Sequence, residues 1–182
     1  MTDVIIATPR KPMDQDEIIN RVASSSLVTL NLEELYPAGE IAEIDLKNLL
    51  FQGLILREKD LRDFIKTHDW NLYQKKNVAI FCSEDAVIPT WAYMLLGIAL
   101  QPYASRVVFG DRNVLITQLF KEVLDQVDWE KFKNAKVVIK GCSDVHVPES
   151  AYVEAATRLR PLAGSILYGE PCSTVPLYKK PK

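Results

Sequence analysis

The sequence predicts an α/β fold, in which helices cover a mostly parallel sheet that is built from a duplicated βαβ unit. The chain resembles itself at an interval of about 59 residues, which is the signature of an internal repeat. From Leu56 onward, short β-branched apolar runs alternate with segments of helical periodicity. The 182 residues are 48% hydrophobic and 25% charged, which is typical of a globular chain with a buried core.

The repeat relates residues 69–111 to residues 128–170. The alignment gives roughly twelve identities over some forty positions, where ordinary composition gives two or three. Matching pairs include Asp69 and Asp128, Trp70 and Trp129, Pro89 and Pro148, and Tyr93 and Tyr152. The alternative is that two βαβ units have converged on similar patterns.

Each unit is predicted to run strand, loop, helix, strand. "KNVAIFC" and "AKVVIKGC" are typical of buried strands, and so are "RVVFGD" and "SILYGE". Pro89 and Pro148 suit the first turn of a helix. "LREKDLRDFIKTH" and "RNVLITQLFKEVLDQV" predict further helices. Right-handed crossovers would make the strands that begin near Val78, Val107, Val137 and Ile166 parallel members of one sheet.

The region before the first unit predicts two more strands. "SLVTLNLEEL" and "EIAEIDLKNLLF" are joined through "YPAGE", and a hairpin would place them antiparallel at the sheet edge. "MTDVIIATPRKP" has no periodic partner and two prolines, so residues 1–13 are predicted to form a flexible or extended arm. Residues 14–182 are then predicted to form a single α/β domain.

Charge and composition exclude several classes of function. The net charge is -2 and no basic stripe is present, which argues against a nucleic-acid partner. No window approaches eighteen apolar residues, and the first residues do not resemble a signal peptide. We therefore expect a cytoplasmic protein without membrane contact, whose three cysteines stay reduced.

The cysteines are the candidate functional residues, and each is followed by Ser. Cys82 and Cys142 end predicted strands, and Cys172 lies just past a third. If one parallel sheet holds these strands, all three thiols lie at its carboxyl edge, where open α/β folds bind ligands. Three thiolates together with His146, Asp111 or Glu170 would complete a tetrahedral zinc or iron site at this edge.

Other interpretations stay open for the same residues. The cysteines could be small buried side chains at strand ends, and His146 an exposed loop residue. Cys142 or Cys172 could instead be the nucleophile of an enzyme on a small molecule, with Asp111, Glu170 or His146 as base. A third hypothesis is a non-enzymatic scaffold that binds another protein through its sheet edge or its C-terminal tail.

Long motifs in the chain resemble those of an uncharacterised bacterial family, domain of unknown function 2480. They include "LVTLNLEELYP", "FQGLILREKDLR", "VIPTWAYMLL" and "GEPCSTVPLYKK", and the resemblance extends from about Ile18 to Lys180. It implies no catalytic residues. Genes of this family tend to lie beside iron–sulfur cluster assembly genes, so the resemblance implies iron–sulfur assembly proteins as partners and a metal-related accessory role.

Overall fold

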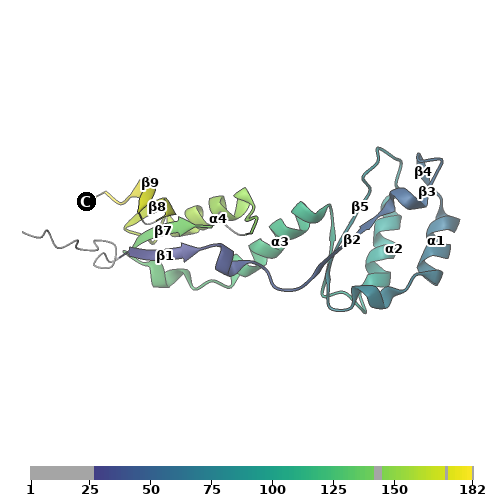
Figure 1. Cartoon of the computed structure of the whole chain (residues 1–182), viewed down its shortest axis with the longest axis horizontal. Helices are drawn as coiled ribbons and strands as arrows, with labels where there is room; N and C mark the ends of the chain where they lie inside the picture. Colours follow the sequence, from purple (N-terminus) through teal and green to yellow (C-terminus); the bar gives the residue numbers. More distant parts are fainter. Residues whose placement is uncertain (1–26, 142–144, 171, 182) are drawn as a thin grey trace, which may run out of the picture.

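The computed structural model describes residues 27–141, 145–170 and 172–181. These residues form a mixed α/β structure with a four-stranded sheet, a three-stranded sheet and a two-stranded hairpin. Figure 1 shows an elongated molecule, with the four-stranded sheet in one half and the three-stranded sheet in the other.

The four-stranded sheet, called sheet A, has the order β1-β7-β8-β9. The strands span Leu27–Asn31 (β1), Lys136–Lys140 (β7), Ser165–Glu170 (β8) and Ser173–Lys179 (β9). β1, β7 and β8 are parallel, and β9 pairs antiparallel with β8. Helix α4 (Glu149–Leu159) connects β7 to β8.

The three-stranded sheet, called sheet B, has the order β2-β5-β6 and is entirely parallel. Its strands span Ile41–Asp45 (β2), Asn77–Phe81 (β5) and Arg106–Phe109 (β6). Helix α2 (Thr90–Leu100) connects β5 to β6. The hairpin of β3 (Leu50–Phe51) and β4 (Ile55–Leu56) leads into helix α1 (Glu58–Thr67).

The prediction of one continuous sheet is therefore wrong. Val78 and Val107 pair with each other in sheet B, and Val137 and Ile166 pair with each other in sheet A. Each predicted pair is parallel, but the two pairs do not share a sheet. Local periodicity identifies strands and their buried faces, whereas sheet membership depends on contacts between residues far apart in sequence.

The prediction of an N-terminal antiparallel hairpin is also wrong. β1 and β2 do not pair with each other: β1 lies parallel to β7, and β2 lies parallel to β5. The segment between them, which includes a short 3-10 helix at Glu33–Leu35, crosses from one half of the molecule to the other (Figure 1). Each sheet thus gains one edge strand from the N-terminal region.

The two segments aligned by the repeat have matching elements in the same register. Asn77 pairs with Arg106 in sheet B, as Lys136 pairs with Ser165 in sheet A. A 3-10 helix precedes the first strand of each segment, at Trp70–Tyr73 and at Trp129–Phe132. Asp69 and Asp128 cap these short helices by accepting hydrogen bonds from the backbone N–H groups of Asn71 and Glu130.

Helix α3 (Arg112–Asp125) joins the two halves. On one side, its buried Leu115 and Leu119 pack with Ala79 and Val108 of sheet B. On another side, its Ile116, Phe120 and Leu124 belong to the core of sheet A, together with Val137, Ile139 and Leu159. Figure 1 shows this helix running between the sheets. A helix that is apolar on two faces is expected where two layers must be covered at once.

The remaining predictions about organisation are not tested by this architecture. The N-terminal arm at residues 1–13 lies outside the described residues, and the single domain at residues 14–182 stays a prediction. No helix among the described residues is both long enough and apolar enough to cross a membrane.

Candidate functional site

The candidate site is a pocket of about 610 Å³ beside helix α4, at the carboxyl end of β7. This volume lies within the range of small-molecule sites in proteins. Parallel α/β units bind ligands at the carboxyl ends of their strands, because the strand-to-helix loops meet there. The pocket is lined by Gly141, Val145, His146 and Val147 of the loop after β7, by Glu149, Tyr152, Val153 and Ala156 of α4, by Tyr168 of β8, and by Leu177 of β9.

Gly141 brings the backbone close to the pocket wall. Its φ is +141°, a conformation that L side chains rarely adopt. A Cβ at this position would lie 3.2 Å from Cβ of Leu32 and 3.3 Å from the hydroxyl oxygen of Tyr152. Glycine therefore lets the loop turn out of β7 while leaving room for the Tyr152 hydroxyl.

Pro148 begins α4 from an extended conformation, with φ -65° and ψ 144°. Proline fixes this φ, which fits the start of a helix. The first turn of α4 then carries Glu149 and, shortly after it, Tyr152 towards the pocket. Pro148 is thus the local feature that aims α4 past the end of β7.

Two tyrosine rings form one wall of the pocket. The rings of Tyr152 and Tyr168 meet edge to face, with centroids 5.7 Å apart and planes at 87°. This geometry is favourable for aromatic pairs and fixes both rings in place. Tyr93 and Phe109 form the corresponding pair in sheet B, with centroids 4.7 Å apart.

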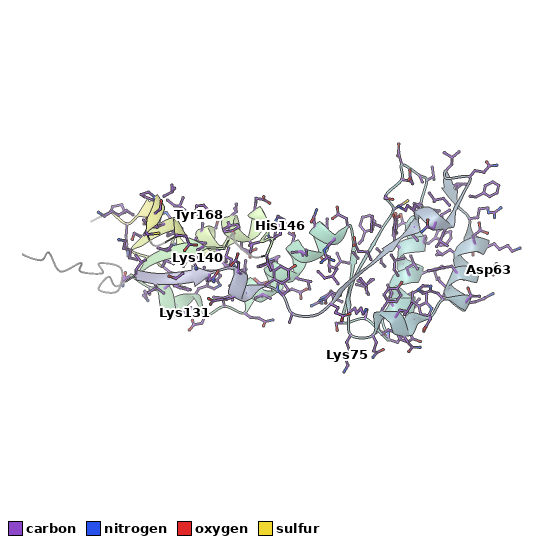
Figure 2. All side chains as sticks on the ribbon, viewed as in Figure 1. Asp63, Lys75, Lys131, Lys140, His146 and Tyr168 are labelled. Carbon is purple, nitrogen blue, oxygen red and sulfur yellow. The ribbon has the colours of Figure 1, made fainter. Side chains whose placement is uncertain are left out.

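His146 is exposed in the loop after β7 and forms part of the pocket lining. Figure 2 shows it in the half of the molecule that also contains Tyr168 and Lys140. Within the described parts of the chain, the imidazole has no hydrogen-bond or ion-pair partner. The imidazole of a histidine can meet a polar group of a bound molecule either as a donor or as an acceptor.

Asp111 and Glu170 have structural partners. Asp111 caps α3, with its carboxylate accepting a hydrogen bond of 3.0 Å from the Val114 backbone N–H. Glu170, at the end of β8, forms an ion pair with Lys140, at 3.7 Å between Oε2 and Nζ. Neither residue lines the pocket.

Cys82 lies in a different sheet from Cys172. Cys82 follows β5 of sheet B and is partly buried against the cluster of Ile80, Ala92 and Leu96. Burial, and then the neighbouring Cys82 thiol, raise the pKa of Tyr93 above its ordinary value of 10.0. This environment is the one expected for a small apolar side chain at a strand end.

The serine after Cys82 ties its loop to the edge strand. Ser83 donates two hydrogen bonds to Asp45 at the end of β2, from its backbone N–H at 3.1 Å and from its hydroxyl at 2.6 Å. Burial raises the pKa of Asp45, but the bonds from Ser83 and Lys47 outweigh it, so the pKa lies below its usual value. The serine after Cys82 therefore holds the loop after β5 against the end of β2.

Cys172 is exposed in the connection between β8 and β9 of sheet A, and Cys142 lies outside the described residues. The shared sheet edge on which a three-thiolate site depended does not exist, because Cys82 and Cys172 follow strands of different sheets. Figure 1 shows β5 and β8 in opposite halves of the molecule. Over residues 27–141, 145–170 and 172–181, no three histidine, cysteine or acidic side chains are grouped closely enough to hold a metal ion.

His146 is the one residue of the pocket lining that the sequence interpretation named as a candidate site residue, and Tyr168 and Leu177 are among those that it missed. Tyr168 could have been found, because it lies near the carboxyl end of the predicted strand "SILYGE", at the edge where a ligand site was expected. Leu177 could not, because the segment after Cys172 had no predicted strand. The structure makes that segment β9, which pairs with the outer edge of β8 and brings Leu177 to the pocket.

A known family accounts for nearly all of the chain. Residues 16–180 match the family model described as "Protein of unknown function (DUF2480)". The chain belongs to the DUF2480 family. The resemblance seen in the sequence motifs is therefore correct, and in this DUF2480 chain the matched region includes both sheets and the whole pocket. Comparisons with curated proteins and with solved structures give no match.

Proposed function

We propose that the chain is a binding protein for a small, largely apolar molecule, which enters the pocket beside α4. The pocket itself carries this proposal: it is about 610 Å³ in volume, and most of its lining is valine, alanine, leucine and tyrosine. Such a lining favours apolar ligands, and a few polar groups then fix the orientation of the ligand.

The polar groups of the pocket define the ligand further. His146 can donate or accept one hydrogen bond, while the Glu149 carboxylate disfavours an anion. We infer an uncharged or weakly basic molecule with one polar group beside His146. Cys172 is not among the residues that line the pocket, so the pocket lends no support to covalent catalysis by Cys172.

A fluorescence titration with N-phenyl-1-naphthylamine, a neutral apolar dye, tests the proposal. We expect the wild-type chain to bind the dye. The Val153→Trp variant, which places an indole at the pocket wall, should lower the affinity by at least about tenfold, a loss of roughly 1.4 kcal/mol.

The control is Ser150→Trp. Ser150 is exposed on the same helix but does not line the pocket, so the same indole there should leave dye binding unchanged. The proposal fails if the wild type does not bind the dye, or if both variants bind it equally.

The metal-related role proposed from the sequence is a separate hypothesis. It would involve zinc or iron, Cys82, Cys142 and Cys172, and iron–sulfur assembly proteins as partners. The separation of Cys82 and Cys172 into two sheets removes the sheet geometry that would have brought their sulfurs together. The hypothesis therefore has less support than the pocket.

A further inference from the structure

Helix α2 is half-exposed, yet none of its 11 residues carries a charge. Met94 is 64% exposed and Ile98 is 70% exposed, one turn apart on the outer side of the helix. A surface helix of a monomer has a polar outer face, whereas a helix that is apolar all round is buried in its final assembly. The outer face of α2 therefore has the composition of a covered surface.

The corresponding helix of sheet A shows that the fold itself does not require this composition. Helix α4 occupies the same place between its two strands, but it carries Glu149, Glu154 and Arg158. Thr157 stands at the position of Ile98 in the aligned repeat. At the position of Met94, α4 also carries an exposed apolar residue, Val153, but its other outer position is the polar Thr157, so the outer face of α2 is the more apolar of the two.

Gly97 lies on the same outer side of α2. A Cβ built at Gly97 would meet no atom within 4 Å, so nothing in the described part of the chain explains a glycine there. Glycine is unfavourable in the middle of a helix, and a common reason to keep it is the close approach of another helix. Met94, Gly97, Ile98 and Gln101 together line a shallow apolar hollow.

Strand β6 next to α2 is the outermost strand of sheet B, and no described strand pairs with its outer side. The equivalent strand β8 has its outer side covered by the antiparallel strand β9. Phe109 of β6 is 67% exposed, and its ring packs against Tyr93 of α2. The Tyr93 and Phe109 rings therefore join α2 to the edge of β6, beside a hollow that Gly97 of α2 and Arg106 and Val107 of β6 line together.

The charges at this edge favour its pairing with an identical edge. β6 has no acidic residue, and its one charged residue, Arg106, is already paired with Glu122 of α3. The opposite edge strand of sheet B, β2, carries Glu43 and Asp45, which would repel a copy of itself. Of the two edges of sheet B, only β6 can meet itself without opposing like charges.

We propose that β6 and α2 form a twofold interface with a second copy of this chain. β6 pairs antiparallel with β6 of the second copy, as β9 pairs with β8 within the chain. The two α2 helices then lie side by side on the same face of the joined sheet and approach closely at Gly97. An isologous contact of this kind closes after two copies.

Sedimentation of the full-length chain over a range of concentrations tests the proposal. The wild type should have about twice the mass of the 20.6 kDa chain. Ile98→Glu should give the monomer, because it buries an unpaired charge in the interface. Thr157→Glu, the matched change on α4, should remain a dimer.

Gly97→Leu provides a second test, because it should stabilise the monomer but weaken the dimer. Leucine favours the helix over glycine, so the melting temperature of the dissociated monomer should rise. The added side chain should separate the two α2 helices, so the dimer dissociation constant should rise by at least about tenfold.

The proposal is overturned if the wild type is a monomer at every concentration, since another partner or a lipid surface would then have to cover α2. It is also overturned if the mass grows without limit, which would indicate an open contact between β6 and a different edge. Dissociation by Thr157→Glu, or a Gly97→Leu dimer as tight as the wild type, would equally contradict it. These variants lie outside the pocket of sheet A, so their outcome is independent of the ligand proposal.

Discussion

Gly141 is the residue on which the shape of the pocket depends most. Its φ is positive, and a Cβ added at this position would lie against Leu32 and against the Tyr152 hydroxyl. Gly53 has a φ of +70° but open space around its Cα. Gly53 is therefore a control position at which a methyl group is added at positive φ without meeting another atom.

We expect Gly141→Ala to reduce the free energy of unfolding by about 1–3 kcal/mol, because a non-glycine residue is strained at this φ. The new methyl group should also displace Tyr152 and weaken dye binding in the titration described above. Gly53→Ala should cost about 1 kcal/mol and leave dye binding unchanged. Urea denaturation and dye titration of both variants measure the two effects. Equal dye affinity in the two variants would show that Gly141 does not shape the pocket.

At the scale of elements, Arg158 joins α4 to the end of α3. Its guanidinium donates a hydrogen bond to the Leu124 carbonyl oxygen at 3.1 Å and forms ion pairs with Asp125 and Glu154. It also lies over the Trp129 ring, 5.6 Å from the ring centre. The hydrogen bond from Arg158 lowers the pKa of Asp125 below its ordinary value of 3.8.

A pH dependence follows from the lowered pKa of Asp125. A carboxyl group whose pKa is lower in the folded than in the unfolded chain stabilises the fold above its unfolded pKa, and this contribution is lost as the pH falls through the folded pKa. We therefore expect Asp125→Asn to melt below the wild type near neutral pH. The difference should shrink as the pH falls below about 4.

Thermal melts of the wild type, Asp125→Asn and a control variant at several pH values measure how the melting-temperature difference depends on pH. Asp63→Asn on α1 is the control, because the Asp63 carboxylate has no ion-pair partner among the described residues. The difference in melting temperature between Asp63→Asn and the wild type should not follow the pH dependence expected for Asp125→Asn. If the melting temperature of Asp125→Asn stayed below that of the wild type by the same amount at every pH, the ion pair with Arg158 would not have the role given to it.

At the scale of the whole molecule, α3 makes the two halves depend on each other. Its buried leucines cover sheet B, and its Ile116, Phe120 and Leu124 complete the core of sheet A. Phe120 is 1% exposed and meets the Tyr36 ring edge to face, at 5.6 Å between centroids. If α3 unfolds, both sheets lose apolar cover at once.

We expect Phe120→Ala to lower the free energy of unfolding by about 3–5 kcal/mol, from lost apolar burial and the cavity left behind. Hydrogen exchange should show β5 of sheet B losing protection together with β7 of sheet A, although Phe120 belongs to the core of sheet A. Val114→Ala on the exposed side of α3 should stay within about 0.5 kcal/mol of the wild type. Loss of protection in β7 alone would show that the two halves unfold independently.

The sequence determined the local elements of this protein. Asp69 and Asp128 cap short helices, and Pro89 and Pro148 stand at the N-terminal ends of α2 and α4. The four apolar runs of the two repeat segments form strands where they were expected. These features depend on side chains and backbone within a few residues of each other, so pattern and propensity suffice. The helical periodicity of "RNVLITQLFKEVLDQV" likewise predicted α3, but not that two of its faces would be buried.

Only the tertiary structure decided how these elements are grouped. The period of a strand shows which side chains share a face, but it does not show which strand lies next to it. The pairing of β1 with β7 joins segments more than a hundred residues apart. The two matching units lie in separate sheets. The same long-range pairing places Cys82 away from Cys172 and brings Leu177 of β9 to the pocket of α4. Such contacts form because apolar surfaces of distant segments must be buried together, and this requirement has no local signature in the sequence.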